Sequence, residues 1–70
     1  MEENTDLINE ILLYIKNGNH DLVYGRLPEQ FERFSRGELS NHVQILIERG
    51  FVTAHIASNG ILYMEMIKVD

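Results

Sequence analysis

The hydrophobic pattern of the chain changes its period once, at Gly50. Before this glycine, apolar residues recur every three or four positions, which is typical of a helix with one buried face. After it, residues 51–56 are rich in β-branched and aromatic side chains, which favour strands. Asn59-Gly60 then supplies a strong signal for a tight chain reversal. The pattern predicts a helix followed by a β-hairpin.

Both ends of this helix are marked in the sequence. Ser35 followed by Glu38 has the spacing of a capping box, in which the serine hydroxyl accepts a hydrogen bond from a free backbone N–H. Arg49-Gly50 places a cation at the negative end of the helix dipole and a glycine where the left-handed residue belongs. We therefore predict a helix over residues 36–49. Its apolar face is formed by Leu39, Val43, Leu46 and Ile47.

A two-residue type I′ turn at Asn59-Gly60 would fix the register of the hairpin. Ile56 would then lie opposite Tyr63, and Val52 opposite Ile67. This register puts Val52, Ala54, Ile56, Tyr63 and Ile67 on one face and Phe51, His55, Leu62, Met64, Met66 and Lys68 on the other. A two-stranded ribbon with two apolar faces cannot bury both unaided.

The first third of the chain predicts another helix, over residues 4–17, with Asn4 or Thr5 as its cap and Gly18 as its end. Its buried stripe is formed by Leu7, Ile8, Ile11, Leu12 and Ile15, and Leu13 falls on the opposite side. Between Gly18 and Phe34 the pattern favours a short strand at residues 22–24 that pairs with the hairpin, then a helical turn at residues 28–33.

This order of elements predicts a small α+β winged helix-turn-helix fold, in one domain spanning residues 1–70. Seventy residues bury only about 60% of the surface of the unfolded chain, so the core is small. There are no cysteines, which excludes disulfides and thiolate metal sites. No apolar run approaches the length of a membrane span, and the start is acidic, unlike a signal peptide. We expect a cytoplasmic protein that has no contact with a membrane.

Three segments resemble an uncharacterised family of small phage and bacterial proteins that is known only as a domain of unknown function. They are the Asp6-to-Ile15 helix, the Ser35-x-x-Glu38 cap, and the stretch from His42 to Val52, which resembles the family's H-V-x-L-L-x-x-A-G-L-I segment. The resemblance covers about half the chain and implies a winged helix, without implying a substrate or cofactor. Members of that family usually continue into a W-x-G-H-E-F-type segment and another helix.

A winged helix without that final helix would leave part of the first helix and one hairpin face uncovered. An exposed apolar patch of this kind commonly marks an interface. The residues that we expect there are Leu13, Ile45, Leu62, Met64 and Met66. Two arrangements would cover them, a homodimer and a complex with a larger protein.

No pattern in the sequence indicates an enzyme. The three histidines lack ligand spacing, and no serine stands in a nucleophile elbow, so we predict neither catalytic nor metal-binding residues. The glycines do not form a phosphate loop, and we expect no cofactor or small-molecule substrate. His42 lies at the edge of the helix's buried face, where a structural hydrogen bond is the simplest role.

The polar face of the helix over residues 36–49 is a candidate DNA-binding surface. Asn and Gln side chains can bond an adenine edge in the major groove, and Arg can bond guanine or phosphate. The residues predicted to contact DNA are Arg26, Arg33, Arg36, Ser40, Asn41, Gln44 and Lys68. The outward face of any helix is polar, however, so this pattern is not specific to DNA binding.

The charge of the chain weighs against DNA. Six Lys and Arg against eleven Asp and Glu give a net charge of −5 and an isoelectric point near 5.0, whereas phosphate neutralisation supplies much of the affinity for nucleic acid. Two hypotheses remain open. The first is a dimeric transcriptional regulator of a phage or mobile element that binds double-stranded DNA. The second is an acidic protein-interaction module, such as a phage-encoded, anti-CRISPR-like inhibitor that binds a basic host protein and no DNA.

Overall fold

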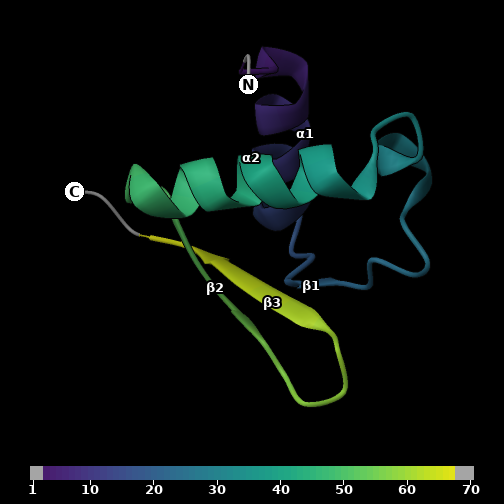
Figure 1. The fold of residues 1–70 in the computed structure, drawn as a ribbon. Helices are drawn as coiled ribbons and strands as arrows, with labels where there is room; N and C mark the ends of the chain where they lie inside the picture. The colour runs from purple at the N-terminus through teal and green to yellow at the C-terminus, as the bar shows by residue number, and fades with distance from the viewer. Residues whose placement is uncertain (1–2, 68–70) are drawn as a thin grey trace.

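Two helices and a three-stranded antiparallel sheet make up residues 3–67, the part of the chain that the computed structural model describes (Figure 1). In chain order the elements are α1 (Thr5–Lys16), β1 (Asp21–Leu22), the 3-10 turn η1 (Glu29–Phe31), α2 (Arg36–Glu48), β2 (Val52–Ile56) and β3 (Leu62–Met66). The strands lie in the order β1-β3-β2. This is the predicted α+β layout of a winged helix, with the hairpin β2-β3 as the wing.

The helix ends follow the local sequence closely. Asn4 caps α1 and accepts a hydrogen bond from the N–H of Leu7, while Ser35 caps α2 and accepts from the N–H of Glu38. At the end of α2, Gly50 has a φ of +77°. The N–H of Gly50 donates to the carbonyl of Ile47, and the N–H of Phe51 donates to the carbonyl of Leu46. These two bonds form a Schellman motif, which satisfies the last carbonyls of the helix. The predicted ends of both helices are confirmed.

The hairpin forms where predicted, but its register is one residue away from the prediction. The structure pairs Ile56 with Leu62 and Val52 with Met66, so the expected pairs of Ile56 with Tyr63 and Val52 with Ile67 are wrong. The reason lies in the turn. The N–H of Gly60 donates to the carbonyl of Ala57, and Gly60 has a φ of +84°.

Among the described residues no non-glycine has positive φ, so Asn59 does not adopt the conformation that a type I′ turn requires. The connection is a three-residue loop, Ser58–Gly60, closed by the hydrogen bond from the N–H of Ala57 to the carbonyl of Ile61. One additional loop residue shifts the strands by one position and moves a whole set of side chains to the other face. Leu62 and Met64 therefore join Val52 and Ala54 on the inner face.

The core lies between the helices and this inner face of the sheet. Its buried side chains come from every element, so the sheet and both helices fold as one unit. They are Leu7, Ile8, Ile11, Ile15, Leu22, Phe31, Leu39, Val43, Leu46, Val52, Leu62 and Met64. Phe31 is fully buried and meets the ring of Tyr14 edge-on, with 5.2 Å between the ring centroids. Phe31 therefore belongs to the core, next to α1.

The region between the helices is reduced to short elements. The predicted strand at residues 22–24 is present as Asp21–Leu22 and pairs with β3, and the predicted helical turn at residues 28–33 is present as the single turn η1. The hydroxyl of Tyr14 donates to the carbonyl of Asp21 at 2.8 Å and fixes this segment to α1. Burial, and then the charge of Asp21, raises the pKa of Tyr14 above its ordinary value.

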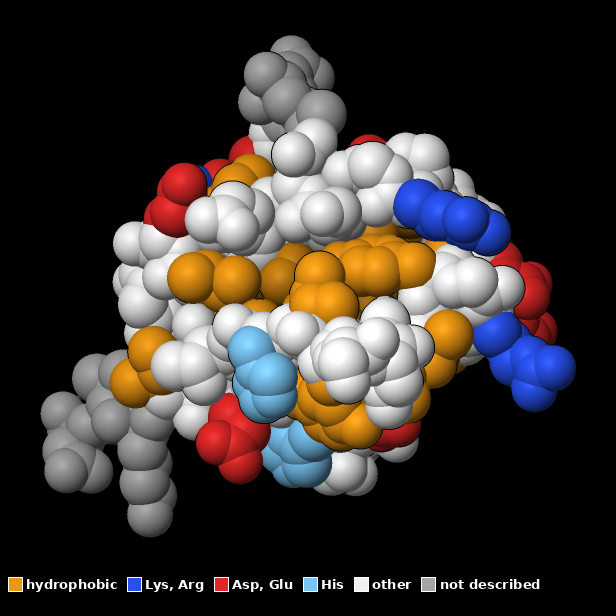
Figure 2. Space-filling model, turned by 60° about the horizontal axis from the view of Figure 1, so that its bottom comes forward, with side chains coloured by type: hydrophobic (Ala, Val, Ile, Leu, Met, Phe, Trp, Pro, Cys, Tyr) orange, Lys and Arg blue, Asp and Glu red, His pale blue; other side chains and the backbone are white. Residues whose placement is uncertain are grey.

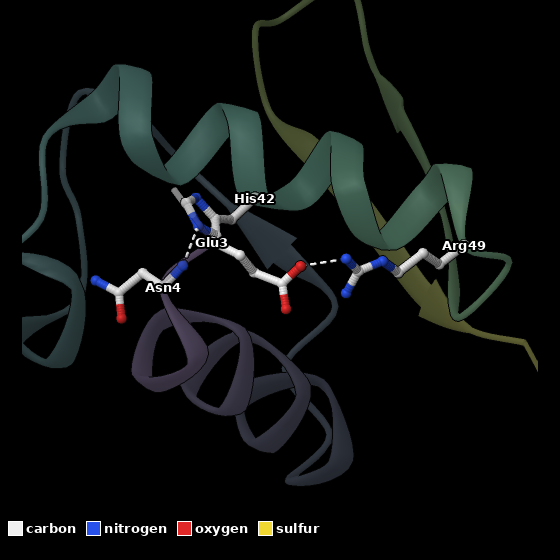
Figure 3. A network of polar contacts seen from close by, with 4 residues as sticks. All are labelled: Glu3, Asn4, His42 and Arg49. Atoms are coloured by element: carbon white, nitrogen blue, oxygen red, sulfur yellow. Dashed lines mark hydrogen bonds and ion pairs between the residues drawn. The ribbon is translucent and has the colours of Figure 1, made fainter. Parts of the chain in front are cut away.

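His42 joins the two helices through the core (Figure 3). It is fully buried, and its Nε2 accepts the backbone N–H of Asn4 at 2.8 Å. Because that N–H is only a donor, Nδ1 carries the ring proton and donates to the carbonyl of Glu38 at 2.7 Å. His42 thus satisfies a free backbone N–H at the start of α1, which confirms its predicted structural role.

Candidate binding groove between the second helix and the hairpin

A groove runs between α2 and the inner face of the distal half of the hairpin. Its volume is about 340 Å³. The helix contributes Ser40, Val43, Gln44 and Ile47, and the hairpin contributes Ala54, His55, Ile56 and Leu62, with Tyr24 beside them. In the view that brings the hairpin forward, hydrophobic side chains gather in a strip across the molecule, and Lys or Arg side chains stand at its right-hand end (Figure 2).

The groove exists because the hairpin extends beyond the helix that covers it. Val52, at the base of β2, is buried under α2, whereas Ile56, at the far end of the same strand, keeps 66% of its surface exposed. Both residues lie on the inner face of the sheet, so the difference in their exposure comes from whether another element packs against them. On the inner face the far end of β2 is apolar and exposed, whereas its neighbour Leu62 on β3 is buried, so Ile56 forms an apolar edge to which a ligand could bind.

The structure places most of the predicted DNA-binding residues on or near this groove. Arg36, Ser40, Asn41 and Gln44 all belong to α2 and are exposed, and two of them, Ser40 and Gln44, line the groove itself. Asn41 has an interaction of its own within the protein. The side chains predicted to face a ligand therefore do face solvent, beside the hairpin.

The predicted phosphate contacts are less uniform. Arg26 and Arg33 are exposed, and both precede α2 in the chain. The guanidinium of Arg33 lies 4.6 Å from the centroid of the Phe34 ring, a cation–π contact that holds the side chain but leaves its N–H groups available. Lys68 lies outside the described residues.

Tyr24 is a groove residue that the sequence reasoning did not identify. It is half-buried, and a side-chain hydrogen bond connects it to Ser40 of α2. Burial raises the pKa of Tyr24, and the bond to Ser40 opposes that shift. No local pattern relates residue 24 to residue 40, since the contact exists only because the segment after β1 returns to the helix.

Arg49, which caps the C-terminal end of α2, is engaged elsewhere. Its guanidinium forms an ion pair with Glu3, next to His42 and Asn4 (Figure 3). The bond to Arg49 lowers the pKa of Glu3 below its ordinary value. Arg49 therefore serves the junction of the helices, and the positive charge of α2 that remains beside the groove comes from Arg36.

The outer face of the sheet carries a second, smaller hollow of about 270 Å³, lined by His20, Thr53, His55, Tyr63, Met64 and Glu65. The rings of His55 and Tyr63 stack at 5.4 Å, and Nδ1 of His20 bonds the carbonyl of Met64 at 3.0 Å. Within residues 3–67 no group of three or more His, Asp or Glu side chains is arranged to hold a metal ion.

The five residues predicted to form an interface do not share one surface. Leu62 and Met64 are buried at 4% and 1% exposure, so their assignment to an interface is wrong. The cause is the register, which turns both residues toward the core. Leu13 and Met66 are exposed and line the same surface hollow, between α1 and the end of β3. Ile45 is half-buried on α2 and does not line that hollow.

No helix in the described part of the chain combines the length and apolar character needed to cross a membrane. Comparison of the chain with protein families, with curated proteins and with solved structures finds no match. The groove and the exposed face of α2 are therefore the features from which a function can be inferred.

Proposed function

We propose that this protein binds double-stranded DNA through α2, as a cytoplasmic regulator of transcription of the kind carried by phages and mobile elements. The observation that supports this most directly is the exposed polar face of α2 beside the hairpin. Ser40, Asn41 and Gln44 are of the size and chemistry that bond base edges in the major groove. Arg36 extends this face at the N-terminal end of the helix, where a phosphate is favoured.

Electrostatics limits how tightly such a complex forms. Arg26, Arg33 and Arg36 are the exposed arginines near this face, and Lys68 is a fourth candidate contact that lies outside the described residues. Three phosphate contacts give a slope of log K against log salt of about −2.7, because each contributes about −0.9. The net charge of −5 opposes binding further. We therefore expect binding that is strong only at low salt.

The test compares two arginines of the same helical segment. Binding to a mixed-sequence duplex is measured by fluorescence anisotropy at several salt concentrations for the wild type, Arg36→Gln and Arg49→Gln. Each variant loses one positive charge, but only the guanidinium of Arg49 is already paired, with the carboxylate of Glu3. We expect Arg36→Gln to weaken binding about fivefold or more and to reduce the salt slope by about 1, with Arg49→Gln close to wild type.

Equal losses in the two variants would mean that net charge, and not the face of α2, determines binding. Absence of binding at low salt would contradict the proposal. Gln44→Ala adds a test of base recognition, because loss of a base contact reduces the preference among sequences and leaves the salt slope unchanged.

A second function is favoured by one specific observation, the apolar character of the groove. Ile47, Ala54 and Ile56 are better suited to protein side chains than to a phosphate backbone. Together with the net charge of −5, this supports a module that binds a basic host protein, for instance as an inhibitor of a nucleic-acid-binding complex. Under this hypothesis Ile56→Ser abolishes the protein complex, and no duplex is bound even at low salt.

A further inference from the structure

The outer face of α1, formed by Asp6, Asn9, Leu13 and Lys16, has no role in the fold. At 100° per residue these four positions lie within an arc of about 80°, on the side of the helix opposite the buried stripe. All four are exposed, and Leu13, near the centre, keeps 52% of its surface in contact with solvent. A large apolar side chain is thus presented between polar and charged neighbours.

This face is hollowed. Asn9, Leu12, Leu13 and Lys16 surround a hollow of about 390 Å³ together with Met66 of β3, which is 40% exposed. The four helical residues stand at positions i, i+3, i+4 and i+7. That is the arrangement in which one helix forms a hole for a side chain of a facing helix. The hollow therefore has room for a side chain of a facing helix, against Leu12, Leu13 and Met66.

The charges of the outer face of α1 are complementary to the same face when it is reversed. Asp6 lies in the first turn and Lys16 in the last, ten residues or about 15 Å apart along the axis. If two such helices pack antiparallel about a two-fold axis at the level of Leu12, Leu13 of each copy lies within the span of the other copy's hollow. Each Asp6 then lies about 3 Å along the axis from the Lys16 of the other copy, within reach of that side chain. Parallel packing in the same register would place like charges together.

We propose that the outer face of α1 binds a second copy of the chain, with the two α1 helices antiparallel and Leu13 of each copy directed into the hollow of the other. A helix of twelve residues is about 18 Å long. Two such faces bury less than about 1,200 Å² in total, which is the size of a transient interface. The dimer therefore forms at high protein concentration and exchanges with the monomer. It does not depend on what α2 binds.

The first test is the mass of the protein in solution. Sedimentation equilibrium from about 10 µM to 1 mM should show a rise from the monomer mass of 8.1 kDa toward twice that value. Leu13→Asp should weaken the association at least tenfold, because it buries a charge in the hollow. Val23→Asp is the matched control, since Val23 is also exposed, at 40%, but does not belong to α1 or line the hollow. It should associate as the wild type does.

The second test reverses the charges. Asp6→Lys and Lys16→Glu should each weaken association severalfold, and the double variant, in which the pair is exchanged, should restore it. Far-UV circular dichroism confirms that each variant is folded, and Leu13→Gln replaces Leu13→Asp if the latter unfolds. A monomer at every concentration, association of both Leu13 variants equal to wild type, or a double variant no better than the single ones would overturn the proposal.

Discussion

The two sides of α2 differ in how completely they are filled. On the side toward α1, Leu39 and Leu46 are fully buried, and His42 bonds the first turn of the neighbouring helix. On the side toward the distal hairpin, Ser40 and Ile47 border an open groove. Both sides belong to one helix of thirteen residues. The closed side stabilises the fold and the open side is available for binding, so substitutions on the two sides should have different consequences.

The largest effect is expected on the closed side. His42→Ala leaves the N–H of Asn4 without its acceptor in a partly buried position and opens a cavity, which together should destabilise the protein by about 2–4 kcal/mol. For a domain of this size each kcal/mol lowers Tm by about 4–8 °C, so thermal unfolding followed by circular dichroism resolves the change.

His55→Ala is the matched control for this variant. His55 is an exposed histidine on the outer face of the sheet, where its ring stacks on Tyr63. Its removal should lower stability by less than about 1 kcal/mol. Equal losses for the two histidines would contradict the view that His42 is held by its bond to α1.

A smaller effect is expected from the turn that shapes the open side. Gly60→Ala places a side chain at a φ of +84°, which should cost about 1–2 kcal/mol although nothing lies within 4 Å of the added carbon. Gly37→Ala, in the first turn of α2, meets equally open space without positive φ and should stabilise the helix by about 0.5–1 kcal/mol. Urea unfolding measures the change in the free energy of unfolding for each variant. If both variants change it in the same direction, alanine at position 60 does not strain the turn.

The smallest effect belongs to the exposed rim of the closed side, the ion pair of Glu3 and Arg49. The pKa of Glu3 is lower in the folded protein than its ordinary value of 4.5, so the pair stabilises the protein above that pH and the contribution is lost as the pH falls through the folded pKa. Glu3→Gln should lower Tm slightly at pH 7 and not at all once the pH is well below the folded pKa of Glu3.

Salt and a double variant sharpen this prediction. The pair is exposed, so its effect should shrink in concentrated salt. In an Arg49→Gln background, Glu3→Gln should change Tm no further, because the partner of the carboxylate is already gone. A loss that persists unchanged in that background would assign the effect of Glu3 to another contact.

The candidate site was only partly predictable from the sequence. The face of α2 with Arg36, Ser40, Asn41 and Gln44 follows from helical periodicity once the cap at Ser35 is recognised, and the structure exposes all four residues. The apolar floor of the groove was not foreseen. It depends on which hairpin residues face inward, and a single residue in the loop at Gly60 reversed that assignment for Leu62 and Met64.

Short-range chemistry accounts for the features that could be predicted from the sequence alone. Helix caps, the glycines that end helices and the chain reversal near residue 59 each involve neighbouring residues, so a local pattern is enough to specify them. The contacts between distant segments became apparent only in the folded molecule. His42 meets Asn4 across 38 positions, Tyr24 meets Ser40, and the far end of β2 stays exposed because the hairpin projects away from α2 (Figure 1). These outcomes depend on how the helices and the sheet pack around a shared core, and no local pattern encodes that geometry.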